Sequence, residues 1–248
     1  MKKALKKIYI FTLITTFLLA IFHHNLPKEI PINININEEK IAYLSFDDGP
    51  SKNTEKILEI LDIYNIKATF FVTGPSYYLK DSLLKKIVSS GHEVAIHSYE
   101  HNYSYIYKSK ENYILDFKKC AKWIKETTGV EPNLYRFPGG SSNTIADKKL
   151  IKEIIKELEK ELYSHVDWNV DTNDSYVKNE SNKIITNALT AIKRNESNSI
   201  YYQTILMHDD TNKPNTVEAL PLLIEKLIHR GYQFKKLTKS EHIVKHVK

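Results

Sequence analysis

Short apolar runs alternate with amphipathic segments from residue 41 to the end of the chain. The apolar runs predict strands at residues 41–46, 68–72, 93–97, 134–136, 163–170, 202–207 and 233–237. The segments between them have helical periodicity, at residues 54–64, 82–90, 110–128, 145–161, 183–194 and 217–230. This alternation is typical of parallel strands joined by crossover helices. We therefore expect an α/β fold, a distorted or incomplete (β/α) barrel of about seven parallel strands. An open doubly wound sheet is the alternative.

A different pattern occupies the N-terminus. Residues 1–7 contain four lysines and no acidic residue, and residues 8–22 form an apolar run. This order is typical of a secretory signal, and extending the run to Leu26 reaches the length of a membrane span. Because no A-x-A cleavage pattern follows, we expect residues 1–26 to be an uncleaved signal-anchor, an N-terminal membrane helix. The rest of this single-pass cell-membrane protein would lie outside the cell; secretion after cleavage is the alternative.

The remaining chain divides into a short connector and one domain. Alternating Ile and Asn residues at 30–37 predict a tether or edge strand within residues 27–38, which leaves residues 39–248 as the domain. Residues 1–30 hold +4 of the net charge of +6, so the other 218 residues carry only +2. A nucleic-acid partner is therefore not expected. The single cysteine, Cys120, excludes an internal disulfide and a four-cysteine zinc site.

Reactive side chains stand at the carboxyl ends of the predicted strands. They are Asp47, Asp48, His97, His101, Arg136, Asp171, Asp174 and His208. In a parallel barrel these strand ends lie at one face, where active sites are found. The pattern therefore predicts one site built from several strands.

Three of these residues are candidate metal ligands. His97 and His101 are four residues apart, so both rings can lie on one side and share a metal, with Asp48 as a third ligand. Two imidazoles and one carboxylate leave room for water on a divalent ion, as in hydrolytic zinc sites. The neighbouring Asp47 would stay free to accept a proton. The alternatives are a surface histidine pair and a simple turn at residues 47–50.

Five short motifs carry a family resemblance. They are SFDDGP at 45–50, HSYEH at 97–101, RFPGG at 136–140, WNVDTND at 168–174 and LMH at 206–208. In kind and order they resemble the motifs of polysaccharide deacetylases, the NodB-homology group or carbohydrate esterase family four. The match covers roughly residues 39–244. Bacterial peptidoglycan N-acetylglucosamine deacetylases are the most similar type.

The resemblance implies a distorted (β/α) barrel and metal-dependent removal of acetyl groups from an acetylated polysaccharide. It implies that Asp48, His97 and His101 bind a divalent metal ion, usually Zn²⁺. It implies that Asp47 is the general base and that His208 is the general acid.

Supporting roles follow from the same resemblance. Arg136 would pair with Asp47 and hold it ionised, while Asp174 would orient His208 and Lys67 would pair with Asp174. The Gly139 amide would stabilise the oxyanion, and Leu206 would line the acetyl pocket. Two positions depart from the family: Gly139 often corresponds to tyrosine, and Ser175 to tryptophan.

The sequence leaves more than one substrate class open. Peptidoglycan N-acetylglucosamine is favoured, because a short tether would keep the domain beside the cell wall. An O-acetyl polysaccharide such as xylan is the alternative, and a non-enzymatic glycan-binding module is a third hypothesis.

Overall fold

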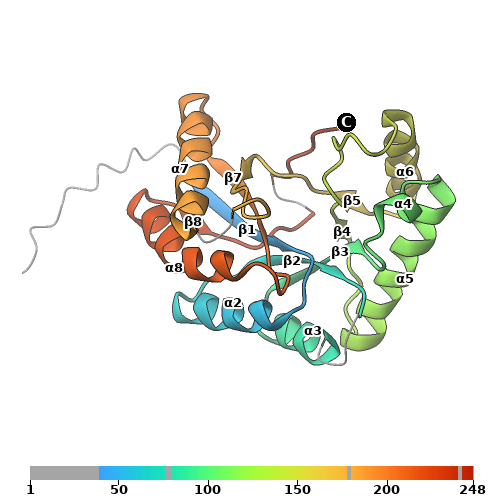
Figure 1. Cartoon of the computed structure of the whole chain (residues 1–248), viewed down its shortest axis with the longest axis horizontal. Coiled ribbons are helices and arrows are strands. Elements are labelled where there is room, and N and C mark those ends of the chain that lie inside the picture. Colours follow the sequence, from blue (N-terminus) through green and yellow to red (C-terminus); the bar gives the residue numbers. More distant parts are fainter. Residues whose placement is uncertain (1–38, 76–79, 178–179, 240–241, 248) are drawn as a thin grey trace, which may run out of the picture. The chain divides into compact units, whose positions relative to one another are not determined.

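The computed structural model describes residues 39–75, 80–177, 180–239 and 242–247 (Figure 1). The predicted signal-anchor at 1–26 and tether at 27–38 lie outside these ranges. Within these ranges, no helix has both the length and the apolar character that crossing a membrane requires.

One sheet of parallel strands forms the centre of the domain. The strand order is β5-β4-β3-β2-β1-β7-β6, and β8 pairs with the start of β1. The strands are β1 (Ile41–Asp47), β2 (Thr69–Thr73), β3 (Glu93–Ser98), β4 (Leu134–Tyr135), β5 (Ser164–His165), β6 (Val170–Asp171), β7 (Tyr202–His208) and β8 (Gln233–Phe234). The predicted parallel α/β architecture is confirmed.

The expected strand at 163–170 is instead two strands, and this split shows how the sheet curls. β5 and β6 lie at opposite ends of the strand order, yet only residues 166–169 separate them in the chain. A chain spans at most about 18 Å from His165 to Val170. The two edges must therefore curve toward each other, and because no ladder joins β5 to β6 among the described strands, the barrel is incomplete.

Helices surround the strands (Figure 1). They are α2 (Lys52–Ile63), α3 (Lys80–Ser89), α4 (Tyr103–Ile106), α5 (Lys110–Thr128), α6 (Lys148–Lys160), α7 (Ser181–Ser197) and α8 (Pro214–His229). In α6, the spacing of the buried residues Ile151, Ile154, Ile155 and Leu158 places them on one stripe. The short α4 was not predicted, because four residues give no detectable periodicity.

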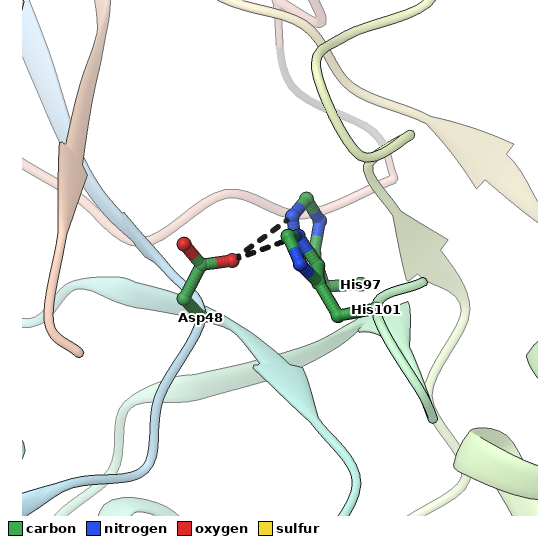
Figure 2. A group of neighbouring side chains, drawn as sticks. All are labelled: Asp48, His97 and His101. Atoms are coloured by element: carbon green, nitrogen blue, oxygen red, sulfur yellow. Dashed lines mark ion pairs between the residues drawn. The ribbon is translucent and has the colours of Figure 1, made fainter. Parts of the chain in front are cut away.

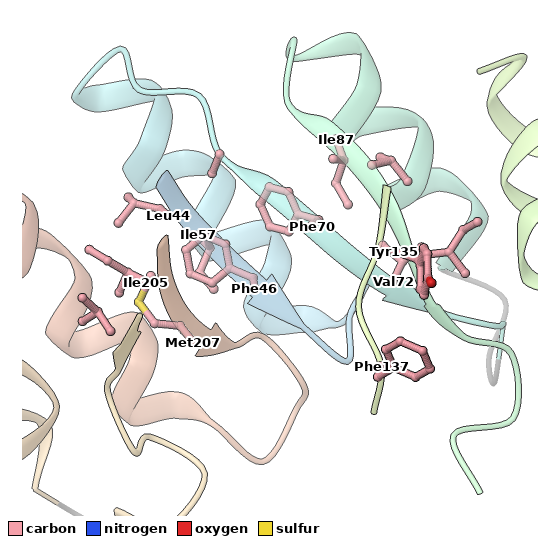
Figure 3. Packing of buried hydrophobic residues seen from close by; sticks show 14 of the residues in the cluster. Leu44, Phe46, Ile57, Phe70, Val72, Ile87, Tyr135, Phe137, Ile205 and Met207 are labelled. Carbon is pink, nitrogen blue, oxygen red and sulfur yellow. The ribbon is translucent and has the colours of Figure 1, made fainter. Parts of the chain in front are cut away.

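Two apolar clusters lie on the two faces of the sheet, and β1 contributes alternate residues to each. Leu44 and Phe46 join the larger cluster, in which Phe46 stacks on Phe70 with ring centroids 5.1 Å apart (Figure 3). Ile41 and Tyr43 belong to the smaller cluster. Because side chains alternate along a strand, Asp47 follows Ile41 and Tyr43 onto the face of the smaller cluster.

Candidate active site

The strand ends bring the predicted groups together at the carboxyl edge of the sheet. Asp47 ends β1 directly opposite His208, which ends the neighbouring β7. His97 lies in β3, Arg136 directly follows β4, and Asp174 follows β6 by three residues. The ends of five separate strands therefore supply one site, as the parallel topology predicts.

Asp48, His97 and His101 form a compact cluster (Figure 2). Asp48 Oδ1 lies 3.4 Å from His97 Nε2 and 3.1 Å from His101 Nε2. Ligand atoms arranged tetrahedrally around one zinc ion are about 3.3 Å apart. Within the described chain, no hydrogen bond satisfies the buried Asp48 Oδ1. The spacing and this unsatisfied oxygen both fit a cation held by the three side chains.

Backbone geometry and outer contacts orient these three side chains. Asp48 and His101 both have positive φ, 79° and 51°, which turns the chain sharply at each of these candidate ligands. His97 Nδ1 lies 2.9 Å from the Arg136 carbonyl oxygen, which leaves Nε2 for the cluster. Burial opposes ionisation of Asp48, but the adjacent imidazoles of His101 and His97 hold its pKa well below the ordinary value.

Asp47 is buried and paired with an internal arginine. The fully buried Arg136 donates from Nη1 to Asp47 Oδ1 at 2.8 Å and to Ser45 Oγ at 3.0 Å. Its Nε and Nη2 donate to the carbonyl oxygens of Val166 and Asp167. Asp47 Oδ2 lies 3.9 Å from His97 Nε2. One carboxylate oxygen is thus fixed by the guanidinium, while the other faces the cluster of Asp48, His97 and His101.

His208 is coupled to a second buried carboxylate. Asp174 Oδ1 accepts from His208 Nδ1 at 2.7 Å, and Oδ2 accepts from the His208 amide and the Thr216 hydroxyl. Burial lowers the pKa of His208, but the hydrogen bond and charge of Asp174 raise it by more, to about 9. The arrangement therefore favours a protonated imidazole.

The predicted pairing of Lys67 with Asp174 is wrong. Lys67 precedes β2, at the amino edge of the sheet, and its Cε lies 3.6 Å from the position of a Cβ on Gly91. The Asp174 carboxylate is occupied by His208 and Thr216. Because parallel strands place their two ends on opposite edges, a residue before β2 cannot reach residues that follow β6 and β7.

Gly139 and Leu206 lie on segments next to these groups. Gly139 is exposed and adopts a φ of 76°, followed by Gly140 at 81°, in a turn closed by the Gly140 amide and the Phe137 carbonyl. Leu206 is 5% exposed, two residues before His208 on β7. Both positions are compatible with the expected substrate contacts.

Three buried aspartates outside the predicted set hold the loops of the site. Asp209 accepts a hydrogen bond from the Thr54 hydroxyl. Its carboxylate lies against the turn at 48–50, where a Cβ on Gly49 would be only 2.1 Å from Asp209 Oδ2. Burial raises the pKa of Asp209 to about 7. Asp167 accepts from the Ser141 amide and hydroxyl, beside Gly139 and Gly140.

Asp116 holds the third loop, between His97 and His101. Sequence reasoning missed it, although one signal was available. Asp116 stands among Tyr113, Phe117 and Cys120 on the buried face of α5. A charged residue on an apolar helix stripe indicates a specific buried partner.

Comparisons of the sequence with known proteins find relatives over most of the chain. A family model described as polysaccharide deacetylase matches residues 35–158. The chain is 32% identical over 217 residues to a peptidoglycan-N-acetylglucosamine deacetylase of Bacillus cereus, covering 87% of this chain and 76% of that protein. It is also 32% identical over 202 residues to a bifunctional xylanase/deacetylase of Pseudobutyrivibrio xylanivorans, covering 81% of this chain and 30% of that protein.

A solved structure gives the same result for the fold. The catalytic domain of a peptidoglycan N-acetylglucosamine deacetylase from Eubacterium rectale superposes with a TM-score of 0.77 at 33% identity. The similarity covers 86% of this chain and 95% of that one.

Proposed function

Because this chain belongs to the polysaccharide deacetylase family, we propose that it removes acetyl groups from an N-acetylated extracellular polysaccharide. Peptidoglycan N-acetylglucosamine is the substrate we favour. The observation that carries the proposal is the grouping of Asp47, His208 and the cluster of Asp48, His97 and His101 at one edge of the sheet.

The cluster would hold a divalent cation, and two imidazoles with one carboxylate favour Zn²⁺. When bound, such a cation polarises the acetyl carbonyl and lowers the pKa of a water molecule to near neutrality. Asp48 supplies the negative charge, and the Arg136 carbonyl keeps the His97 ring oriented.

Asp47 is the proposed proton acceptor. Its Oδ2 faces the cluster, where an attacking water would lose its proton, while Arg136 fixes Oδ1 and balances the buried charge. The Gly139 amide is the proposed donor to the oxyanion that develops on the acetyl oxygen. Leu206 is the proposed apolar contact for the acetyl methyl group.

His208 is the proposed proton donor to the departing amine. An amine leaves as a neutral molecule only if its nitrogen gains a proton, so the imidazole must be protonated at the working pH. Asp174 meets this requirement, because its carboxylate raises the pKa of His208 to about 9.

Substituting Asp174 by asparagine is expected to move the alkaline limb of the kcat/KM profile to lower pH. Without the carboxylate, the pKa of His208 falls from about 9 toward its ordinary value of about 6.5, so the imidazole loses its proton at a pH about two units lower. The measurement is the pH dependence of acetate release. Thr216→Val is the matched control, because it removes a hydrogen bond to Asp174 but keeps the charge. An unchanged alkaline limb in a folded Asp174→Asn protein would refute this role.

Acetate release from a small glycan panel tests the substrate class. The full-length chain is loaded with Zn²⁺ and offered N-acetylchitooligosaccharides, purified peptidoglycan and acetylated xylan. We expect release from the N-acetylated glycans. Release from xylan alone would assign the O-acetyl esterase function instead, and glycan binding without release from any substrate would indicate a binding module.

We also propose that residues 1–26 anchor the domain in the cell membrane, with residues 39–248 outside the cell. The support is the lysine cluster followed by the apolar run. Protease accessibility of the domain in intact cells tests this orientation, and complete protection of the domain would reject it.

A further inference from the structure

We propose that Asp116 is a positioning residue that sets the affinity of the site for its cation. The proposal rests on the proposed cation site and concerns a residue outside the five motifs. Asp116 lies on α5 and is only 4% exposed, and in the described part of the chain its hydrogen bonds go to Ser98, Tyr99 and Glu100 rather than to a ligand side chain. Its effect would pass entirely through the loop between His97 and His101.

Every residue between the two histidines donates a hydrogen bond to this one carboxylate. Asp116 Oδ2 accepts from the Ser98 hydroxyl at 2.6 Å and the Tyr99 amide at 2.8 Å. Oδ1 accepts from the Glu100 amide at 2.8 Å. A single buried acid thus fixes the whole segment that separates two metal ligands.

The hydrogen bonds of the Asp116 carboxylate go to the loop between His97 and His101. No ion pair joins Asp116 to a Lys, Arg or His in the part of the chain that the structure describes, and apolar residues of α5 flank it. Its desolvated charge is therefore compensated mainly by the three loop donors, and hydrogen bonds to an ionised acceptor are the strong kind. These bonds make alternative conformations of the loop costly.

Ser98 transmits this constraint to a ligand. Its hydroxyl oxygen accepts from the His101 amide at 2.8 Å while its hydrogen is donated to Asp116. His101 has a φ of 51°, in the left-handed region that non-glycine residues disfavour. The chain from Asp116 through Ser98 therefore stabilises the turn that places His101 Nε2 3.1 Å from Asp48 Oδ1.

The expected consequence is a change in cation affinity rather than in the chemistry. Outer contacts that orient metal ligands typically contribute 10–100-fold in affinity. Both carboxylate oxygens of Asp116 accept hydrogen bonds from the loop. In Asp116→Asn, an NH₂ group replaces one of these oxygens and faces a hydrogen-bond donor, so at least one bond is lost and the loop loosens. The three ligands and both proton-transfer groups are unchanged, so excess cation is expected to restore turnover.

The test is the Zn²⁺ dissociation constant of the metal-free, full-length chain, measured by competition with a chromophoric chelator. We expect Asp116→Asn to raise it about 10–100-fold. Glu126→Gln, which removes an exposed carboxylate from the same helix, is expected to leave it unchanged. We also expect kcat at saturating Zn²⁺ to be close to that of the unmodified protein. A purely structural role predicts instead a loss of kcat that excess Zn²⁺ does not restore.

A second pair of variants covers the case in which Asp116→Asn does not fold. Ser98→Ala removes the hydroxyl that joins Asp116 to the His101 amide but keeps the bonds from the Tyr99 and Glu100 amides to Asp116, and it is expected to weaken Zn²⁺ binding. Ser98→Thr keeps the hydroxyl and is expected to bind Zn²⁺ with the affinity of the unmodified protein. Unchanged Zn²⁺ affinity in folded Asp116→Asn, or in folded Ser98→Ala, would overturn the proposal. Failure of the unmodified chain to bind Zn²⁺ would instead overturn the proposed cation site itself, so the two failures are distinguishable.

Discussion

Replacing Asp47 by asparagine is expected to lower kcat by a factor of about 10²–10⁴ while a divalent cation still binds. The asparagine cannot accept the proton that the attacking water must lose. Asp48, His97 and His101 remain in place, and Asp47 Oδ2 lies 3.9 Å from His97 Nε2, outside hydrogen-bond distance. Acetate release and Zn²⁺ affinity, measured on the same preparation, separate turnover from binding.

The stability of this variant must be measured alongside its activity. Asparagine leaves the fully buried Arg136 without its counter-charge, and breaking a buried ion pair typically costs about 3–5 kcal/mol. A lower Tm is therefore expected for Asp47→Asn. Its activity is compared with that of the unmodified protein at a temperature below the Tm of both. Asp171→Asn is the matched control, because the Asp171 carboxylate, at the end of β6, accepts a hydrogen bond from the nearby Asn173 amide and pairs with no basic side chain among the described residues. A near-normal kcat in folded Asp47→Asn would refute the proton-acceptor role.

Removing a metal ligand is expected to abolish both cation binding and activity. In Asp48→Asn the cluster loses its only negative charge, and in His97→Ala it loses a ring that the Arg136 carbonyl holds in place. Removing a direct ligand should lower the Zn²⁺ affinity by more than the roughly 10–100-fold that loss of an outer contact costs. The measurement is Zn²⁺ affinity by chelator competition, followed by acetate release at saturating Zn²⁺.

His229→Ala is the control for this pair, because His229 is an exposed histidine on α8. It should bind Zn²⁺ and turn over substrate normally. Retention of tight Zn²⁺ binding by folded His97→Ala would contradict the assignment of the ligands, because two remaining side chains do not make a closed site.

The strand and helix pattern was largely predictable because it follows from local periodicity. Each predicted helix overlaps an observed one, and α5 has the predicted bounds. The run at 163–170 could not be divided from sequence, because β5 and β6 differ only in which distant strand they pair with. Which strand each of them pairs with depends on how the sheet curls, and the pattern of apolar residues carries no information about that curvature.

The site shows the same division between local and long-range information. The positions of Asp47, His97 and His208 at strand ends are visible in the sequence, so their meeting follows from parallel topology. The Lys67 pairing failed because it ignored which end of β2 that residue occupies. Asp116 was missed because it reaches the loop between His97 and His101 from a helix, 16 residues beyond Glu100, a contact set by packing of α5 on the sheet.

The most direct test of the central claim is anomalous X-ray scattering at the zinc edge from crystals of the Zn²⁺-loaded protein. The account predicts one strong peak about 2.0–2.2 Å from an Asp48 carboxylate oxygen, His97 Nε2 and His101 Nε2, with Asp47 and His208 beside it. Absence of a peak among these side chains at saturating Zn²⁺, or a peak held by other residues, would contradict it.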